Sequence, residues 1–422
     1  MTREKIFTFL HFGYLPDASL SDCVVLRNLN LTEWRNKKAI LCKKPLQMLI
    51  KEGVLTLKRA IQKSLHQSDR GNHIVLLSGG LDSRAILGEL IEILDRKDII
   101  AVTFGTPGTW DFEIPKLVAR TAGVHHECID LTSSQWKWDF EGMVKTAAKM
   151  ETPTWLFDAY VFYQILQRFG KECVYWSGFM GEALAGAHLL KQDSPTWEQA
   201  KSSFVAHQRF SRSLELATSD FKAEDQLPIT PWIDPEVLSY DDQLDFGIRQ
   251  WCLIRPTLLP KGYDHRTPFL HPNWVEFIIN VPRRYREKQY LYKEILKAAY
   301  PRLFSLPTTN QGLPLDAPFR KRGLRLVERG FRAFCKRVFP RSRWGVSLAM
   351  KYIDFNRGLR ERNDLKAIVF ESIQSLKKRG IIDWIDIDDI WHRHHHKQGN
   401  YADALILLAS LEMNIVAGRI TL

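Results

Sequence analysis

Apolar residues between positions 73 and 178 alternate between two patterns. Short apolar runs typical of buried strands occur four times, as "HIVLL" (73–77), "IIAVTFG" (99–105), "HHECIDL" (125–131) and "KECVYWSG" (171–178). The segment "FEIPKLVARTAG" between the second and third runs has helical spacing and ends at Gly123. Strands that alternate with helices predict an α/β fold with a doubly wound parallel sheet.

Helical patterns also flank this region. "PLQMLIKEGVLTLKRAIQKSL" (45–65) predicts a helix before the first strand, and the chain becomes mostly helical from Pro195 onward. The tail "ADALILLASLEMNIVAG" (402–418) predicts a final amphipathic helix. The N-terminal "MTREKIFTFLHFGYLPDASL" has basic residues before an apolar run, as a signal peptide does. His11 interrupts this run and no signal-peptide cleavage site follows, so we interpret the segment as a strand.

Composition narrows the possible classes. The chain is 45% hydrophobic, and no apolar run approaches the roughly 20 residues that cross a bilayer. Its six cysteines are scattered without a C-x-x-C pair, which argues against a disulfide scaffold, a zinc ribbon or a redox dithiol and favours a cytoplasmic setting.

The net charge of +12 is concentrated late in the chain. Residues 319–362 contain 14 Lys/Arg and 3 Asp/Glu, interleaved with the aromatics Phe331, Phe334, Phe339 and Trp344. Such a segment suits RNA phosphates, an acidic protein or an anionic membrane surface, and peripheral membrane association is the first of these that we expect. A core-packed helix with a solvated basic face is the alternative.

The first predicted strand is followed by the loop Ser78-Gly79-Gly80-Leu81-Asp82-Ser83. Ligands collect at the carboxyl ends of parallel strands, and glycines let the backbone approach a phosphate closely. The next helix would direct its free N–H groups and positive dipole end at the anion. An acidic residue in such a site makes sense if Mg²⁺ bridges Asp82 to the phosphates.

No G-K-[ST] follows this loop, so it is not a Walker motif. It resembles the S-G-G-x-D-S loop of ATP pyrophosphatases. "DFEIPKLVARTAGVHHECIDL", "SGFMGEALAG", "YDHRTPFLHPNWVEFIINVP" and "YLYKEILKAAYP" are similar to segments of one branch, the asparagine synthetase family. The resemblance implies the adenine-nucleotide α-hydrolase type of fold and ATP-dependent adenylation of a carboxylate, followed by amide formation with release of AMP and pyrophosphate.

The resemblance also implies roles for individual residues. Backbone around Thr103, Phe104 and Gly105 would receive adenine, while Asp82 and Glu182 would hold Mg²⁺. Lys293 and Glu182 would be catalytic, with Lys293 stabilising negative charge as the acyl-adenylate is attacked. The phosphates of ATP would be bound by Ser78, Gly79, Gly80, Asp82, Ser83, Ser177 and Gly178.

The N-terminal "FLHFGYLPDASL" resembles the end of that family's glutaminase domain, and Thr2 replaces the cysteine that hydrolyses glutamine. We therefore expect free ammonia, a separate glutaminase or an amine on the substrate as the nitrogen source. β-Lactam synthetases and lasso-peptide cyclases are similar in lacking glutamine hydrolysis. The expected parts are a β-rich remnant (1–44), an ATP-pyrophosphatase synthetase domain (45–318) and a basic helical region (319–422).

Two departures from the family pattern concern the site. Phe179 stands where asparagine synthetases have a glutamate base, and a phenyl ring cannot move a proton, so another base is required. "TTNQGLP" lacks the Arg and Lys that often precede Gln-Gly, which removes positive charge near the phosphates. We expect Asp264 and Arg266 to form a structural ion pair and "HRHHHK" (392–397) to be a solvated or anion-facing patch.

Two other functions remain open. A tRNA-lysidine synthetase-like enzyme would fit the length and basicity, although "TFGTPGTWDFE" lacks that family's His-Asn-His type of segment. A nucleotide-binding pseudoenzyme within a biosynthetic complex would fit Phe179. The substrate itself, a small-molecule or peptide carboxylate, has no fixed motif.

Overall fold

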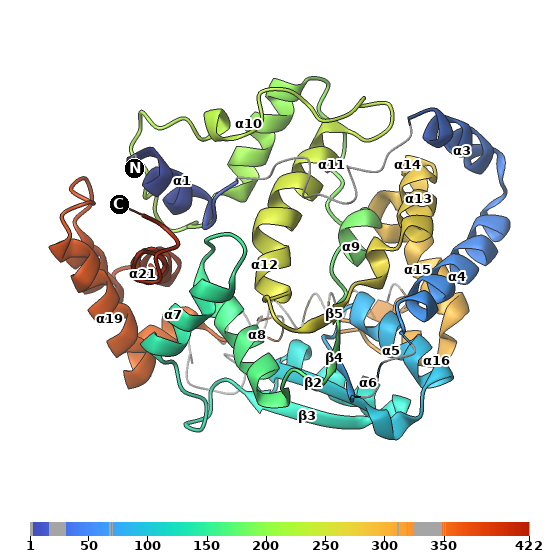
Figure 1. The fold of residues 1–422 in the computed structure, drawn as a ribbon, viewed down its shortest axis with the longest axis horizontal. Coiled ribbons are helices and arrows are strands. Elements are labelled where there is room, and N and C mark those ends of the chain that lie inside the picture. Colours follow the sequence, from blue (N-terminus) through green and yellow to red (C-terminus); the bar gives the residue numbers. More distant parts are fainter. Residues whose placement is uncertain are drawn as a thin grey trace.

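The structure, a computed structural model, describes residues 3–16, 31–66, 71–309, 312–318 and 352–421, with a few single positions between these ranges. Its centre is a five-stranded sheet in which every pairing is parallel, in the order β3-β2-β1-β4-β5 (Figure 1). The strands are β1 (His73–Leu76), β2 (Ile99–Gly105), β3 (His125–Asp130), β4 (Val174–Trp176) and β5 (Asp264–Arg266). The predicted α/β class with a parallel sheet is confirmed.

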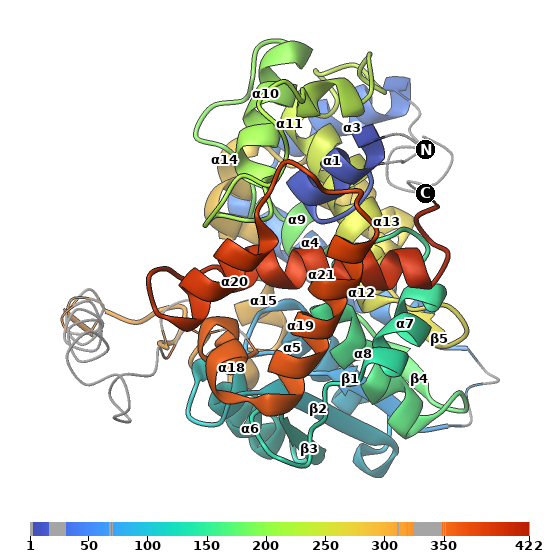
Figure 2. The ribbon, with the colours of Figure 1, turned by 90° about the vertical axis from the view of Figure 1, so that its left-hand side faces the viewer.

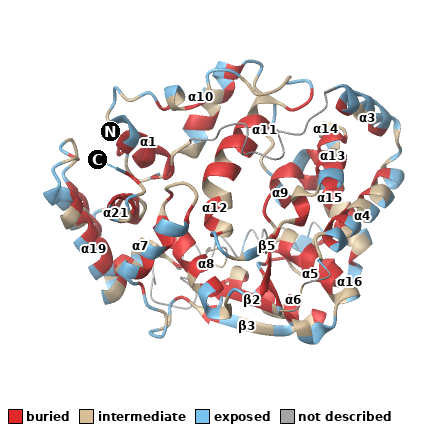
Figure 3. Cartoon of the chain, viewed as in Figure 1, coloured by how far each residue is buried: buried red, intermediate tan, exposed pale blue. Residues whose placement is uncertain are grey.

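Helices cover both faces of this sheet, because the strands alternate their apolar side chains between two cores. Buried residues lie on the strands and on the helices around them (Figure 3). Val75 and Trp176 belong to the core beneath α4, α5, α6, α13 and α15, whereas Ile74 and Tyr175 belong to the core beneath α7, α8, α19 and α21. The helices that precede the last layer are α4 (Leu46–Lys63), α5 (Asp82–Ile93), α6 (Trp110–Ala122), α7 (Phe140–Lys149), α8 (Leu156–Phe169), α9 (Gly181–Leu184), α10 (Trp197–Gln208), α11 (Tyr240–Leu244), η3 (Asp245–Ile254), α12 (Arg255–Leu258), α13 (Pro272–Asn280), α14 (Arg283–Arg286), α15 (Tyr290–Ala299) and α16 (Pro301–Phe304).

The described part of the C-terminal region is helical, as predicted. It consists of α18 (Phe355–Glu361), α19 (Asn363–Lys378), α20 (Ile387–His395) and α21 (Ala402–Val416), which form a layer beside α7 and α8 (Figure 2). The prediction that the last helix is amphipathic is wrong. Helix α21 is buried around its circumference, and even Glu412 is fully buried, where it pairs with Arg379 at 2.7 Å.

The expected N-terminal strand is also wrong. Arg3–Phe12 forms helix α1, whose Ile6, Phe9 and Leu10 pack into the core that contains α21. The other described helix of 1–44 is α3 (Leu31–Lys43), and the β pairing in the described residues of this range is an isolated antiparallel bridge between Tyr14 and Thr154. The described part is therefore mainly helical. Aromatic and β-branched residues favoured a strand, but tertiary packing of one apolar helical face prevailed.

Most of the basic segment 319–362, with Phe331, Phe334, Phe339 and Trp344, lies outside the described residues, and its expected contact with an anionic surface stays a prediction. Within the described ranges, no helix is both long and apolar enough to cross a membrane. Cys42, Cys128, Cys173 and Cys252 are not joined in disulfides in the described part of the chain.

Candidate active site

The loop from residue 77 to residue 83 joins the end of β1 to the start of α5 and is closed on itself. The Ser78 amide donates to Ser83 Oγ at 3.1 Å, and the Gly80 amide donates to Ser78 Oγ at 3.2 Å. Because α5 begins at Asp82, the loop wraps the N-terminus of a twelve-residue helix. Backbone N–H groups and two serine hydroxyls are therefore gathered at the positive end of a helix dipole.

Gly79 is required by the segment that covers the loop. A Cβ at this position would lie 2.1 Å from Thr309 Cγ2, and the Thr309 amide donates to the Gly79 carbonyl at 3.2 Å. Arg84 is fully buried and donates to the carbonyls of Gly79 at 3.1 Å and Pro307 at 2.8 Å, with longer bonds to Leu303 and Leu306. One guanidinium thus ties the loop to residues 303–307.

Asp82 is the acidic centre of the site. Its Oδ2 accepts the Glu182 amide at 2.9 Å, and its Oδ1 accepts the Tyr292 hydroxyl at 2.7 Å. Burial and then the negative charge of Glu182 raise the pKa of Asp82 to about 7, against the opposing effect of these two hydrogen bonds and of His188. A carboxylate that is costly to ionise without a partner is suited to a bound cation.

Two glycines on the other side allow this close approach. A Cβ on Gly178 would lie 2.7 Å from Asp82 Cβ, and a Cβ on Gly181 would lie 2.4 Å from Asp82 Cγ. Both belong to the turn from β4 into α9, which also carries Glu182. The turn after β4 and the loop after β1 therefore meet because neither glycine has a side chain.

Glu182 points outward, with its side chain 64% exposed. Its Oε1 lies 3.9 Å from His188 Nε2, and His188 Nδ1 lies 2.8 Å from the buried carboxylate of Asp245. Burial alone would lower the pKa of His188, but the hydrogen bond and charge of Asp245 outweigh it, so that pKa is raised. An imidazole whose protonated form is favoured by Asp245 thus lies beside Glu182.

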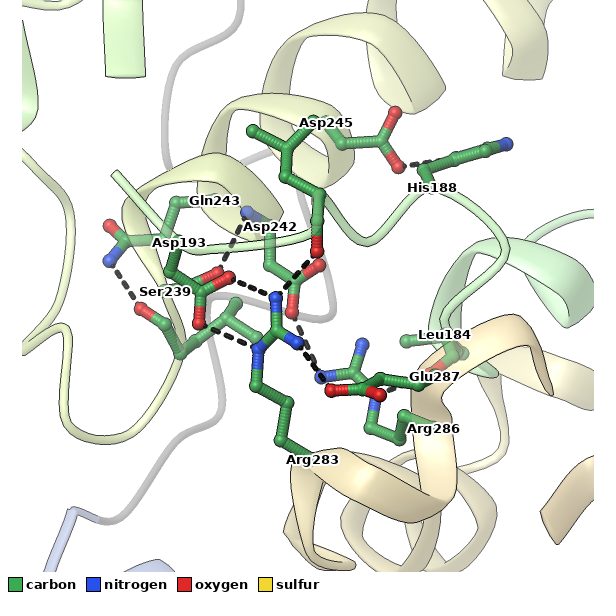
Figure 4. A network of polar contacts seen from close by, with 12 residues as sticks. Leu184, His188, Asp193, Ser239, Asp242, Gln243, Asp245, Arg283, Arg286 and Glu287 are labelled. Carbon is green, nitrogen blue, oxygen red and sulfur yellow. Dashed lines mark hydrogen bonds and ion pairs between the residues drawn. The ribbon is translucent and has the colours of Figure 1, made fainter. Parts of the chain in front are cut away.

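A buried ionic network holds α9 in place (Figure 4). Arg286 donates to the Leu184 carbonyl at 3.0 Å and to Asp242 at 2.9 Å, and both charged side chains are buried. Next to it, Arg283 forms a two-pronged ion pair with Asp193, with both contacts at 2.9 Å. Since α9 carries Glu182, the network fixes the backbone from which that carboxylate projects.

These elements enclose a cavity of about 370 Å³ at the carboxyl ends of the strands. Most predicted site residues line it, namely Ser78, Gly80, Asp82, Ser83, Phe104, Ser177, Gly178 and Glu182. Gly79 lies beneath Thr309, and Thr103 is buried and donates to the Leu77 carbonyl at 2.9 Å, so neither contributes to the lining. Gly105 is likewise outside the lining residues and adopts a φ of +146°.

Lys293 is on α15 but not among the cavity-lining residues. Its Nζ donates to the Lys288 carbonyl at 2.6 Å, one peptide away from Gln289, which does line the cavity. Lys288 and Gln289 both have positive φ, of 53° and 60°, and form the bend that starts α15. The ammonium group of Lys293 is therefore near the rim of the cavity. The catalytic role of Lys293 stays a prediction.

The remaining predictions have mixed outcomes. Arg266 pairs with Asp264 and, at 2.7 Å, with Asp69, which confirms the structural ion pair. Phe179 is 2% exposed, with its ring 6.1 Å from that of Trp251, so its side chain belongs to the core.

The histidine tract is only partly a solvated patch. His392 and His396 stack with their ring centroids 3.8 Å apart, but His394 is fully buried and accepts the Tyr401 amide at 3.1 Å. Burial, followed by the charge of Arg360, lowers the pKa of His394 to about 4. The prediction of a solvated patch is thus wrong for His394. No cluster of three or more metal-ligating side chains occurs in the described part of the chain.

Several residues at the site were missed from the sequence. Tyr292, Arg84, Gln250 and Tyr352 have no motif of their own. Tyr352 stacks on Phe104 with ring centroids 4.9 Å apart, and both line the cavity. The clearest available signal was position: Arg84 directly follows the Asp82-Ser83 pair, and Tyr292 directly precedes Lys293.

Together, the parallel sheet, the glycine-rich loop at a helix N-terminus and the facing acidic residues define a nucleotide-binding α/β domain. Residues 55–230 match the family model described as asparagine synthase. The chain therefore contains an asparagine synthase-type domain over this range, which implies ATP-dependent, amide-forming adenylation chemistry in general terms. Asp82 and Glu182 lie within the match, whereas Lys293 lies beyond its end. A search of curated proteins found no match.

Proposed function

We propose that this chain adenylates a carboxylate with ATP and then joins the acyl group to an amine, releasing AMP and pyrophosphate. The observation that carries the proposal is the meeting of the loop at residues 78–83 with Glu182 in one cavity, where Asp82 accepts hydrogen bonds from Glu182 and Tyr292. The backbone amides and serine hydroxyls of this loop would bind the β and γ phosphates, and Phe104 would contact adenine.

The residues present fit Mg²⁺. Asp82 and Glu182 supply oxygen ligands, the type that Mg²⁺ prefers, and the raised pKa of Asp82 reflects its burial first and then the negative charge of Glu182, both of which a bound cation would offset. Bound there, the metal would neutralise charge on the phosphates. Ser78, Ser83 and the helix N-terminus then orient the triphosphate, and Arg84 keeps the loop in register through the Gly79 carbonyl.

The buried ring of Phe179 means that the proton of the attacking nitrogen goes to a different group, and we propose that the substrate supplies this amine. Ammonia, free or from a separate glutaminase, is the alternative donor. A relationship to β-lactam synthetases and lasso-peptide cyclases, which also lack glutamine hydrolysis, is part of this proposal, as is a cytoplasmic setting.

ATP–pyrophosphate exchange with a panel of carboxylates tests the proposal. We expect carboxylate-dependent exchange that requires Mg²⁺, is lost in Asp82→Ala and is kept in Asp95→Ala, which removes an exposed acid just beyond the far end of α5. Exchange that survives Asp82→Ala would show the metal assignment to be wrong. ATP binding without exchange would favour the pseudoenzyme suggested by Phe179, and salt-sensitive tRNA binding would favour the tRNA-modifying alternative.

A further inference from the structure

One wall of the cavity comes from a single continuous helical rod, formed by α11, η3 and α12 (Figure 1). Its central ten residues, Asp245–Ile254, form a π-helix. Such helices are rare and frequently occur at functional sites. Side chains four residues apart lie on the same side of a helix. Gln250, Ile254 and Leu258 follow this spacing, and all three line the cavity.

This row carries no charge. Ile254 and Leu258 present aliphatic side chains that are only half-buried, as expected for groups that face a cavity. Gln250 is 4% exposed, and its amide nitrogen donates to Asp245 Oδ1 at 3.4 Å. The amide oxygen of Gln250 has no hydrogen-bond partner among the described residues. The row therefore offers two apolar contacts and one neutral acceptor.

The neighbouring lining strengthens this apolar character. Phe162, Phe179 and Met180 are buried side chains that border the same cavity. Among the described lining residues, the charged ones are Asp82, Asp111 and Glu182, and all are acidic. A second carboxylate on the substrate would find no cationic side chain among these described lining residues and would have to be desolvated beside acidic ones.

We infer that the acid adenylated at this site has an apolar body, aliphatic or aromatic, that packs on Ile254 and Leu258, and that it carries no second anionic group. This inference rests on the proposed function and specifies its substrate class. The reacting carboxylate points towards the phosphate loop, the apolar body lies against the π-helical wall, and the Gln250 oxygen accepts a hydrogen bond from a neutral or amine donor on the substrate.

The test compares acids of similar size that differ in polarity. In ATP–pyrophosphate exchange, kcat/KM for 3-phenylpropionate and 4-methylpentanoate should exceed that for succinate and aspartate by at least about 10-fold, a ratio typical of apolar pockets. Ile254→Lys should reverse this order, losing at least about 10-fold with the apolar acids while gaining with the dicarboxylates. Ile229→Lys is the matched control, because Ile229 is 87% exposed and does not line the cavity.

Leu258→Lys is a second variant in case Ile254→Lys does not fold, with thermal unfolding and ATP binding as checks on both. Preference of the wild-type protein for succinate or aspartate would overturn the inference and leave the adenylating function intact. An unchanged substrate order in both folded Lys variants would also overturn it. If no acid supports exchange, the proposed function fails and the inference falls with it.

Discussion

Tyr292 donates a hydrogen bond from its hydroxyl to Asp82 Oδ1 at 2.7 Å, so helix α15 reaches back to the loop after β1, the first strand of the sheet. This bond, with the Glu182 amide, counteracts burial and keeps the pKa of Asp82 at about 7. A hydrogen bond to a charged group contributes about 1.5–3 kcal/mol. Tyr292 therefore keeps a substantial fraction of Asp82 ionised at neutral pH.

Tyr292→Phe should raise the pKa of Asp82 further and so reduce the ionised fraction at pH 7. We expect the Mg²⁺ concentration for half-maximal exchange to rise several-fold at pH 7 and the difference to shrink at pH 9, where the carboxyl is ionised in both proteins. Tyr300→Phe is the control, since Tyr300 bonds Glu89 at 3.0 Å outside the cavity. If Tyr292→Phe needed the same Mg²⁺ concentration as the wild-type protein at both pH values, this role of Tyr292 would be contradicted.

The same carboxyl should make the metal-free protein less stable as the pH rises. Folding raises the pKa of Asp82 from 3.8 to about 7, so the folded state binds the proton more tightly, and the free energy of unfolding declines between these two pH values. Asp82→Asn removes this dependence. At pH 8 it should be more stable than the wild-type protein by on the order of 2–4 kcal/mol, with no difference below about pH 4.

Urea unfolding across this pH range, in chelator and then in excess Mg²⁺, measures the effect. Bound cation should narrow the gap at pH 8, because it stabilises the wild-type carboxylate only. A gap that is the same at pH 4 and pH 8 would mean that Asp82 is not the group responsible.

Gly181 should be intolerant of any side chain. A Cβ there would lie 2.4–2.8 Å from the carboxyl atoms of Asp82, so Gly181→Ala must displace the acid or the start of α9. We expect pyrophosphate exchange to fall by at least about 100-fold, because a displacement of about 1 Å can have this effect. Gly323→Ala, whose added Cβ would lie within 4 Å of no atom of the described residues, should keep full activity. Exchange near the wild-type rate in Gly181→Ala would show that the tight contact is not needed.

The predictable parts of this molecule are those with a repeated local pattern. Four strands were evident as apolar runs, and Gly123, at φ +71°, ends α6 where the sequence predicted. Strand β5 was missed because "DHR" carries two charges and no apolar alternation, and it is a strand only through its pairing with β4. Propensity could not foresee that pairing, nor the helix at Arg3–Phe12.

The residues of the site likewise divide into those with a local sequence pattern and those placed only by tertiary packing. A contiguous motif located Asp82 and Ser83, whereas Tyr292 reaches Asp82, and Gln250 reaches the cavity, from more than 160 residues away along the chain. Their roles depend on which face of a helix meets the cavity. The i, i+4 spacing of Gln250, Ile254 and Leu258 can be read from the sequence, but it does not reveal that this side of the helical rod lines the cavity.

Lys293 provides the sharpest test of the predicted catalytic set. Its ammonium donates to the Lys288 carbonyl at 2.6 Å, beside Gln289 at the cavity rim. If it stabilises charge as the adenylate is attacked, Lys293→Met should lower kcat for amide formation by about 10²–10³-fold, with little change in the KM for ATP. Lys297→Met is the matched control, because Lys297 is one turn further along α15 and pairs with Glu294 and Asp316.

The alternative for Lys293 is a structural role at the bend formed by Lys288 and Gln289, both in left-handed conformation. In that case Lys293→Met would lower the unfolding midpoint and raise the KM for ATP together with any loss of kcat, as Gln289 moves from the cavity. Lys293→Arg separates the two roles, because arginine can still donate to the Lys288 carbonyl. If Lys293→Arg restored stability but not kcat, the ammonium group would act in the chemical step. If Lys293→Arg restored both stability and kcat, the role of Lys293 would be to support the bend.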